Sequence, residues 1–262
     1  MATVIRTQNL AVSFDGREPI FEGLNLAVEE GEFVTVVGVS GAGKSTLLRV
    51  IADLIAPFNG SVRVEHPRQN PTRRPIAMVF QAANLLPWRR VNDNVTLGLE
   101  GLEVGEEVKR QRIEWALKLV GLEGYGDRWP YQLSGGQRQR IGIARALAVD
   151  PDILLMDEPF GALDAITRTG LQGELLRIWK ETGKSILFVT HDIEEAVFLG
   201  DRVVLLGDKP GRIVQEYAVT IERTTRREST EFVRKVEEVR GGLQAAIHSA
   251  AAGGSGNAYR AG

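Results

Sequence analysis

The stretch FVTVVGVSGAGKST, residues 33–46, decides the fold of this chain. Five apolar or β-branched residues precede a glycine-rich turn and Lys44, which predicts a buried strand, a loop and a helix in that order. The loop satisfies the pattern G-x-x-x-x-G-K-[ST], in which backbone amides and a helix N-terminus surround phosphate oxygens. The residues expected to form this phosphate loop are Gly38, Val39, Ser40, Gly41, Ala42, Gly43, Lys44, Ser45 and Thr46.

Composition narrows the function classes. Hydrophobic residues make up 43% and charged residues 25% of the 262 positions, which is ordinary for a folded globular chain. The net charge of −2 supplies no positive field for nucleic acid, so we expect no nucleic-acid partner. The absence of cysteine excludes disulfides and thiolate zinc sites. The longest charge-free run near the start, residues 33–43, is too short to cross a bilayer, so a membrane role would require another chain to span it.

Strand and helix patterns alternate along most of the chain. Short Val/Ile/Leu-rich runs up to about residue 64 predict strands with tight connections. Later apolar runs at 153–156, 186–190 and 202–206 alternate with helical patterns near 164–182 and 192–199. This alternation predicts an α/β fold with a parallel, doubly wound sheet.

Helical patterns also mark an insertion and the end of the chain. We expect a helix over 44–56 with Leu54 on its apolar face, and a helical subdomain over about 85–150 inserted into a single domain spanning 1–250. A last amphipathic helix is expected over 228–248, and residues 251–262 are expected to be a disordered tail. The apolar positions of that last helix are Phe232, Val236, Val239, Leu243 and Ile247.

Polar residues follow four of the predicted strands. Gly38, Gln81, the pair Asp157 and Glu158, and His191 each come directly after an apolar run. Ligands of parallel sheets bind beyond the carboxyl ends of the strands, so these groups are expected to share one edge.

Each of these groups has a specific expected role. Lys44 would reach the β and γ phosphates, and Ser45 would ligate Mg²⁺. A carboxylate at a buried strand end, Asp157, needs a cation or hydrogen-bond donors, and hydrated magnesium supplies them. Glu158 would orient or deprotonate the attacking water. Gln81 and His191 each have two interpretations. Gln81 either caps a turn or contacts magnesium or water. His191 is either an ordinary buried or helix-capping residue or a sensor of the γ phosphate.

Two aromatic residues lie outside this set. Phe14 could pack in the core, but its position between a strand and a turn favours stacking on adenine. Trp88, between Pro87 and two arginines, is expected to be exposed and to serve an interface.

A second glycine-rich loop, LSGGQRQR at 133–140, also opens a helix. Its Ser134, Gly135, Gly136 and Gln137 would form another anion-binding terminus, although one nucleotide has a single triphosphate. A head-to-tail pair of subunits resolves this, since the second loop of each subunit would then close on the phosphates held by the other.

The ordered set GVSGAGKST, Gln81, LSGGQRQR, ILLMDEP, GALD and His191 resembles the ATPase subunits of ABC transporters over about residues 4–220. The resemblance implies a P-loop NTPase core with a mainly parallel sheet, an N-terminal antiparallel β-subdomain and the inserted helical subdomain. It implies that Glu158 is the catalytic base, His191 the switch histidine and Asp164 part of a loop that couples the two sites. Residues 81–94, around Trp88, would contact the transmembrane subunits.

The resemblance also implies ligands, partners and a location. ATP would be the substrate, with Mg²⁺ held by Ser45, by Gln81 and, through water, by Asp157. The partners would be a second copy or a similar ATPase subunit, two permease subunits and, indirectly, an external solute-binding protein, at the cytoplasmic face of the cell membrane, in bacteria the inner membrane. The segments LLPWRRVNDNV and KPGRI (209–213) resemble the nitrate, sulfonate and taurine importer group.

The sequence departs from the family pattern at four positions. Val39 and Ala42 replace a frequent proline and cysteine, Phe14 replaces the commoner tyrosine, and Asp53 stands where glycine is usual. The first three changes keep the loop backbone and the stacking ring, whereas Asp53 should alter the helix after the phosphate loop.

Two other function classes share parts of this pattern. A small-molecule kinase would contain the phosphate loop but would not need LSGGQ. A non-transport ABC ATPase acting on DNA or ribosomes would carry two nucleotide domains or a long coiled-coil insertion in one chain, and this sequence has neither.

Overall fold

The computed structural model describes residues 2–14, 18–65, 71–223 and 225–254. They fall into two compact units, each built from separated stretches of chain. The first unit comprises Met1–Val4, Glu29–Glu32 and Glu65–Leu187, and the second comprises Ile5–Val28, Phe33–Val64 and Phe188–Gly262. Sequence analysis expected a single domain over residues 1–250, and that organisation stays a prediction.

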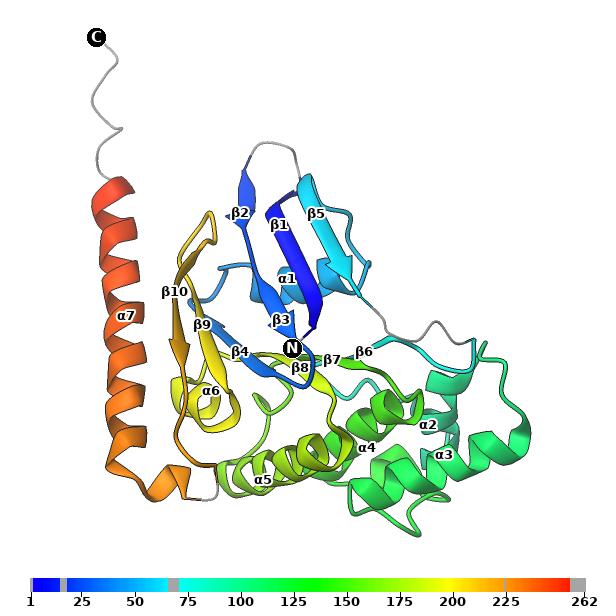
Figure 1. Cartoon of the computed structure of the whole chain (residues 1–262). Coiled ribbons are helices and arrows are strands. Elements are labelled where there is room, and N and C mark those ends of the chain that lie inside the picture. The colour runs from blue at the N-terminus through cyan, green and yellow to red at the C-terminus, as the bar shows by residue number, and fades with distance from the viewer. Residues whose placement is uncertain (1, 15–17, 66–70, 224, 255–262) are drawn as a thin grey trace. The chain divides into compact units, whose positions relative to one another are not determined.

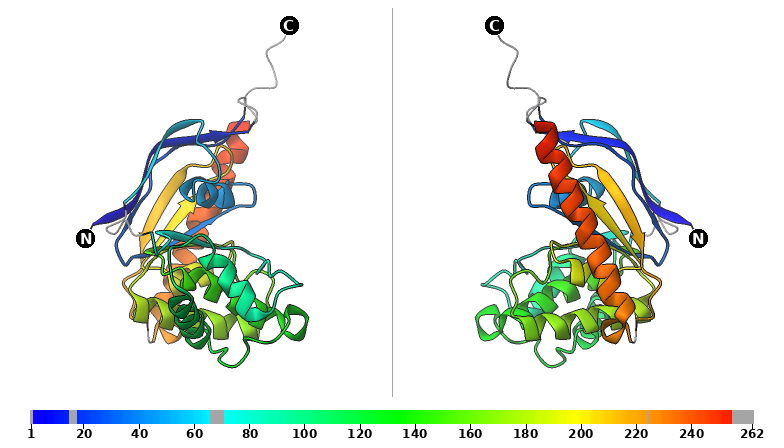
Figure 2. Two further views of the ribbon diagram at one scale, coloured as in Figure 1. Left: turned by 90° about the vertical axis from the view of Figure 1, so that its right-hand side faces the viewer. Right: turned by 90° about the vertical axis from the view of Figure 1, so that its left-hand side faces the viewer.

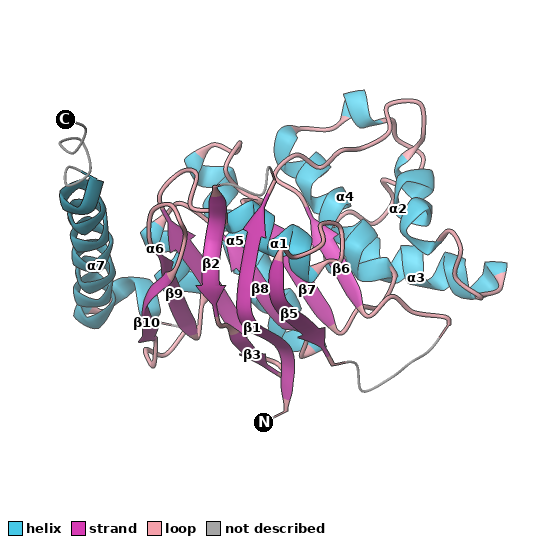
Figure 3. Ribbon diagram, turned by 90° about the horizontal axis from the view of Figure 1, so that it is seen from above, coloured by secondary structure: helices cyan, strands magenta, loops and turns pink. Residues whose placement is uncertain are grey.

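An antiparallel sheet, whose strands are drawn in Figure 3, lies almost entirely in the second unit. Its strands run in the order β2-β1-β3, with β5 also paired to β1. Ile5 lies opposite Val64 and Leu10 opposite Leu24, so apolar residues line one face. The bounds are β1 (Thr3–Ser13), β2 (Pro19–Leu24), β3 (Ala27–Glu29) and β5 (Asn59–Val64). These strands form the expected antiparallel N-terminal part.

Parallel strands occur in both units, as expected. In the second unit β4 (Phe33–Gly38) pairs parallel with β9 (Arg202–Leu206), and β10 (Ile213–Ala218) pairs antiparallel with β9. In the first unit β6 (Ile76–Val79) pairs parallel with β7 (Ile153–Asp157). Every residue of β4, β7 and β8 (Ser185–Val189) is buried, which explains their continuous apolar sequence.

The first unit contains the expected helical region (Figure 1). Helices α2, α3 and α4 pack on one another through buried residues that include Val95, Leu99, Ala116 and Ile141. The bounds are α2 (Val91–Leu99), α3 (Glu106–Leu119), the short η1 (Pro130–Gln132), α4 (Gly135–Ala148) and α5 (Ala165–Thr182).

The second unit contains α1 (Lys44–Ile51), α6 (Ile193–Leu199), η2 (Arg226–Glu228) and the long α7 (Thr230–Gly254), which Figure 2 shows along its whole length. Phe232, Val236 and Val239 of α7 join a core cluster with Leu205 and Tyr217, as the periodicity predicts. Packing explains the glycine at position 242, because a side chain there would overlap the Tyr217 hydroxyl.

Three expectations about helices need correction. The helix after the phosphate loop ends at Ile51 rather than Ala56, because Asp53 adopts a left-handed φ of 58°. Leu54 is consequently 62% exposed, and Ile247 of α7 is also exposed. The last helix includes residues 251–254 of the expected tail, and residues 255–262 lie outside the described residues. No helix among the described residues is long and apolar enough to span a membrane.

Candidate functional site

The phosphate loop connects β4 to α1 in the second unit. Gly41 and Gly43 have φ values of 86° and 88°, a left-handed conformation that favours glycine. A Cβ on Gly43 would also stand 2.6 Å from Ile20 Cγ2. These two glycines therefore allow the chain to turn sharply and start α1 directly at Lys44.

Lys44 is held across this loop. Its Nζ donates to the carbonyl oxygens of Gly38 at 2.8 Å and Val39 at 3.0 Å, and the residue is buried. The Ala42 amide donates to Val39 O at 3.2 Å and closes the turn. A cationic group is thus fixed inside a turn of backbone amides at a helix N-terminus, which is an anion-binding arrangement.

His191 and Phe14 belong to the same unit. The Thr190 amide donates to Val36 O at 3.1 Å. The residue before His191 is therefore hydrogen-bonded to β4, the strand that leads into the phosphate loop. His191 is exposed at the start of α6, which excludes the buried interpretation. Phe14 follows β1 and is 70% exposed, which excludes the core interpretation.

The carboxylates lie in the first unit. Asp157 is the last residue of β7 and is 8% exposed, and Glu158 follows with a left-handed φ of 44°. Such a backbone is costly for a residue with a Cβ, and strain of this kind is concentrated at functional sites. Gly161 leaves room beside them, because a Cβ there would lie 3.3 Å from Gln81 Nε2 and 3.7 Å from Glu158 Oε2. Gln81 and Glu158 are therefore neighbours, as the strand-end rule predicts.

Helix α4 fixes the backbone on both sides of Gln81. Gln139 Nε2 donates to Phe80 O at 3.1 Å. Arg145 donates to Ala83 O at 2.7 Å and to Asn84 O at 3.1 Å, and burial lowers the pKa of its guanidinium. Sequence analysis missed both residues, because side chains that bind carbonyl oxygens leave no motif.

The second glycine loop forms the start of α4. Ser134 Oγ accepts from Gln137 N at 3.2 Å, and Gln137 Oε1 accepts from Ser134 N at 2.9 Å, which makes a capping box. Ser134 and Gly135 are exposed, as an anion-binding terminus requires.

Asp164 caps the neighbouring helix. Its carboxylate accepts from Thr167 N at 3.0 Å, and this hydrogen bond holds the pKa of Asp164 below its usual range. A Cβ on Gly136 would lie 2.5 Å from Thr167 Cγ2, so the starts of α4 and α5 are in close contact. The structure thus brings Asp164 beside the second glycine loop.

The segment around Trp88 is fixed by a buried asparagine. Asn94 on α2 accepts from Leu86 N at 2.7 Å and donates to the carbonyls of Leu86, Arg89 and Arg90. Trp88 at the centre of this turn is 70% exposed, as predicted. Sequence analysis missed Asn94, although an asparagine inside an otherwise apolar helix face was a signal of its role.

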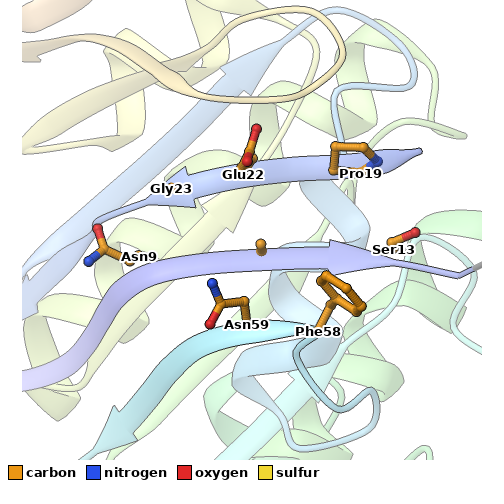
Figure 4. Close-up of a pocket in the computed structure, with 8 residues that line it drawn as sticks. Asn9, Ser13, Pro19, Glu22, Gly23, Phe58 and Asn59 are labelled. Atoms are coloured by element: carbon orange, nitrogen blue, oxygen red, sulfur yellow. The ribbon is translucent and has the colours of Figure 1, made fainter. Parts of the chain in front are cut away.

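A separate hollow of about 510 Å³ lies on the antiparallel sheet (Figure 4). Its lining residues are Asn9, Ala11, Ser13, Pro19, Glu22, Gly23, Phe58 and Asn59. None of the predicted site residues lines this hollow, so it is distinct from the phosphate loop.

Residues 21–161 match the family model of the ABC transporter. The chain belongs to this family. An uncharacterized ABC transporter ATP-binding protein of Methanocaldococcus jannaschii is 48% identical over 89% of this chain and 88% of its own length. The taurine import ATP-binding protein TauB of Escherichia coli O157:H7 is 50% identical over 79% of this chain and 82% of its own length.

Solved structures agree with this assignment to the ABC ATPases. A dimeric ATP-binding cassette in a post-hydrolysis state with ADP and Pi is 34% identical, with a TM-score of 0.70 over 83% of this chain and all of that one. The cbiO1 protein of Clostridium perfringens, part of the transporter complex cbiONQ, is 26% identical, with a TM-score of 0.75 over 94% of this chain and all of that one. The chain is therefore an ATP-binding subunit that hydrolyses ATP and has the fold expected from its sequence.

Proposed function

We propose that this ABC ATPase powers import of a small anion of the sulfonate, taurine or nitrate type. Support for the solute class comes from the identity with the taurine import protein TauB and from the segments 85–95 and 209–213 noted above. The proximity of Glu158, which follows β7, to Gln81, which follows β6, is the observation that carries the catalytic part.

Binding in this proposal begins at the phosphate loop. Loop amides and Lys44 hold the phosphates, and Lys44 exchanges its bonds to Gly38 O and Val39 O for phosphate oxygens. The exposed ring of Phe14 stacks on the adenine. The hydroxyl of Ser45 and the amide oxygen of Gln81 are ligands of the kind that Mg²⁺ prefers, and the carboxylate of Asp157 would hold the ion through water. The ion would neutralise phosphate charge.

Hydrolysis then depends on Glu158 and His191. Glu158 accepts a proton from the attacking water, and the Gln81 amide orients that water. His191 contacts the γ phosphate and reports its presence to α6. The strained backbone of Glu158 fits a carboxylate whose direction is set by function rather than by local packing.

The second glycine loop acts on a partner subunit in this proposal. Ser134 and the first amides of α4 close on the phosphates of a neighbouring copy, and Asp164 couples the two sites through its contact with the same helix end. Solved structures of a similar ATP-binding cassette are dimeric, which supports such a pair.

The turn around Trp88 binds the permease subunits of the transporter at the cytoplasmic face of the membrane. Asn94 holds this turn, and exposed tryptophans favour interfaces. The chain contacts the external solute-binding protein only through the permease.

Glu158→Gln tests the chemistry. The variant is expected to bind ATP as the wild type does and to turn over at least about a hundredfold more slowly, the usual effect of losing a general base. Glu123→Gln, which makes the same change at an exposed site, should leave turnover unchanged. Near-normal hydrolysis by Glu158→Gln would remove Glu158 from this role.

A further inference from the structure

Helix α6 starts two residues after His191, and its first turn fixes the backbone around that histidine. The carboxylate of Glu195 accepts a hydrogen bond from Thr190 Oγ1, which in turn accepts from Asp192 N at 3.0 Å. Asp192 caps the helix by accepting from Glu195 N at 3.1 Å. The residues on both sides of His191 are therefore bound to α6, so the histidine moves with this helix.

The other end of α6 is held by a buried arginine. Arg226 is 2% exposed, and its Nη1 donates to the carbonyls of Phe198 and Gly200, both at 2.9 Å, and of Val197 at 3.2 Å. Its Nη2 and Nε donate to Ile221 O at 2.7 and 3.0 Å. The guanidinium thus joins the C-terminal carbonyls of α6 to the segment that leads into α7.

Two further arginines act on the same helix end. Arg223 donates to Leu199 O and lies 2.5 Å from Asp201. Arg227 stacks on the ring of Phe198 at 3.8 Å from its centroid. Burial, and then the neighbouring Arg223, lower the pKa of Arg226 to about 10, so it stays charged at neutral pH.

The length of α6 makes these contacts important. The helix has only seven residues, and helices this short are marginal without tertiary contacts and caps. The last carbonyls of a helix have no partner within it, and a cation there is stabilising. Arg226 supplies both the partners and the charge.

We propose that Arg226 is a positioning residue for His191, which it holds in place through α6. This inference rests on the proposed role of His191 in sensing the γ phosphate. It makes Arg226, which belongs to no recognised motif, part of the machinery that sets the turnover rate.

The test is a double-mutant cycle on ATP turnover with Arg226→Lys and His191→Ala. Lysine keeps the charge but lacks the planar guanidinium that donates to several carbonyls at once, so kcat should fall on the order of tenfold. KM for ATP should change less than about twofold, because the phosphate loop is untouched. In the His191→Ala background the same substitution should change kcat less than about twofold. Arg234→Lys, on the exposed face of α7 beside Glu231, is the matched control and should not change kcat.

The outcomes are distinguishable. If Arg226→Lys lowers kcat equally with and without His191, or leaves it unchanged, the positioning role is overturned while the proposed function stands. If His191→Ala alone has wild-type turnover, the proposed role of His191 fails and the positioning role fails with it. If Arg226→Lys does not fold, Arg223→Lys tests the same end of α6. Its fall in kcat should be smaller, and it should likewise disappear in the His191→Ala background. Hydrogen exchange of residues 190–199 should be faster in either arginine variant.

Discussion

The backbone of Gly211 lies directly against Ala42 in the phosphate loop, and a side chain at Gly211 would overlap Ala42 O. Gly211 N also donates to Ile20 O at 2.8 Å, and Glu22 N donates to Gly211 O at 3.3 Å. The loop at 209–213, which sequence analysis connected only with the importer group, therefore supports the outer side of the phosphate loop.

Gly211→Ala should displace the phosphate loop and weaken ATP binding. Overpacking a tight site costs about 1–3 kcal/mol, so we expect the Kd for ATP to rise roughly tenfold. Titration with a fluorescent ATP analogue measures this. Gly241→Ala is the matched control, because nothing lies near a Cβ at that position. An unchanged Kd for Gly211→Ala would mean that the contact does not shape the loop.

Asp53→Gly should stabilise the chain. The left-handed φ of 58° at the end of α1 suits glycine better than aspartate, so the free energy of unfolding should rise by about 0.5–1 kcal/mol. Denaturant unfolding measures the change. Arg49→Gly, inside the same helix and exposed, should lower stability by about 1 kcal/mol. Destabilisation by Asp53→Gly would show that the aspartate side chain has a role of its own.

The fold and part of the site follow from local sequence patterns, whereas the end of α1 does not. Buried parallel strands and the glycine loops carry strong local patterns. The strand ends at Gly38 and Asp157, and the position of His191 soon after β8, were therefore predictable. The early end of α1 was missed because Asp53 takes a conformation that residue frequencies assign to glycine.

Contacts between side chains and carbonyl oxygens were not predictable either. Asn94, Arg145 and Arg226 each bind main-chain oxygens of residues whose identity is irrelevant to the bond. Asn94 left one signal, its place on an otherwise apolar helix face, whereas no sequence pattern marks the carbonyl partners of Arg145 and Arg226.

Asn94→Ala should destabilise the turn that presents Trp88. Leu86 N and three carbonyls lose their partner, which predicts a cost of about 2–4 kcal/mol in unfolding free energy. Asn92→Ala, exposed on the same helix, should change stability by no more than about 0.5 kcal/mol. Equal effects of the two substitutions in thermal unfolding would contradict the role assigned to Asn94.

Trp88→Ala should separate hydrolysis from assembly. Basal turnover of the isolated subunit is expected to stay at the wild-type level, while association with the permease subunits weakens. Co-purification with tagged permease measures the weakened association. The control is Trp115→Ala, which removes an exposed tryptophan from α3. Unchanged co-purification of Trp88→Ala would refute the interface.

In the proposed dimer, two copies of the chain bind each triphosphate from opposite sides. The chain has no cysteine, so single cysteines can be placed at Ser40 and Ser134 in two differently tagged Glu158→Gln subunits. With Mg²⁺ and ATP, oxidation should link the Ser40→Cys subunit to the Ser134→Cys subunit, and should link a control pair of Ser40→Cys and Glu123→Cys far less. No link above that control, with a monomeric mass in light scattering, would contradict the account.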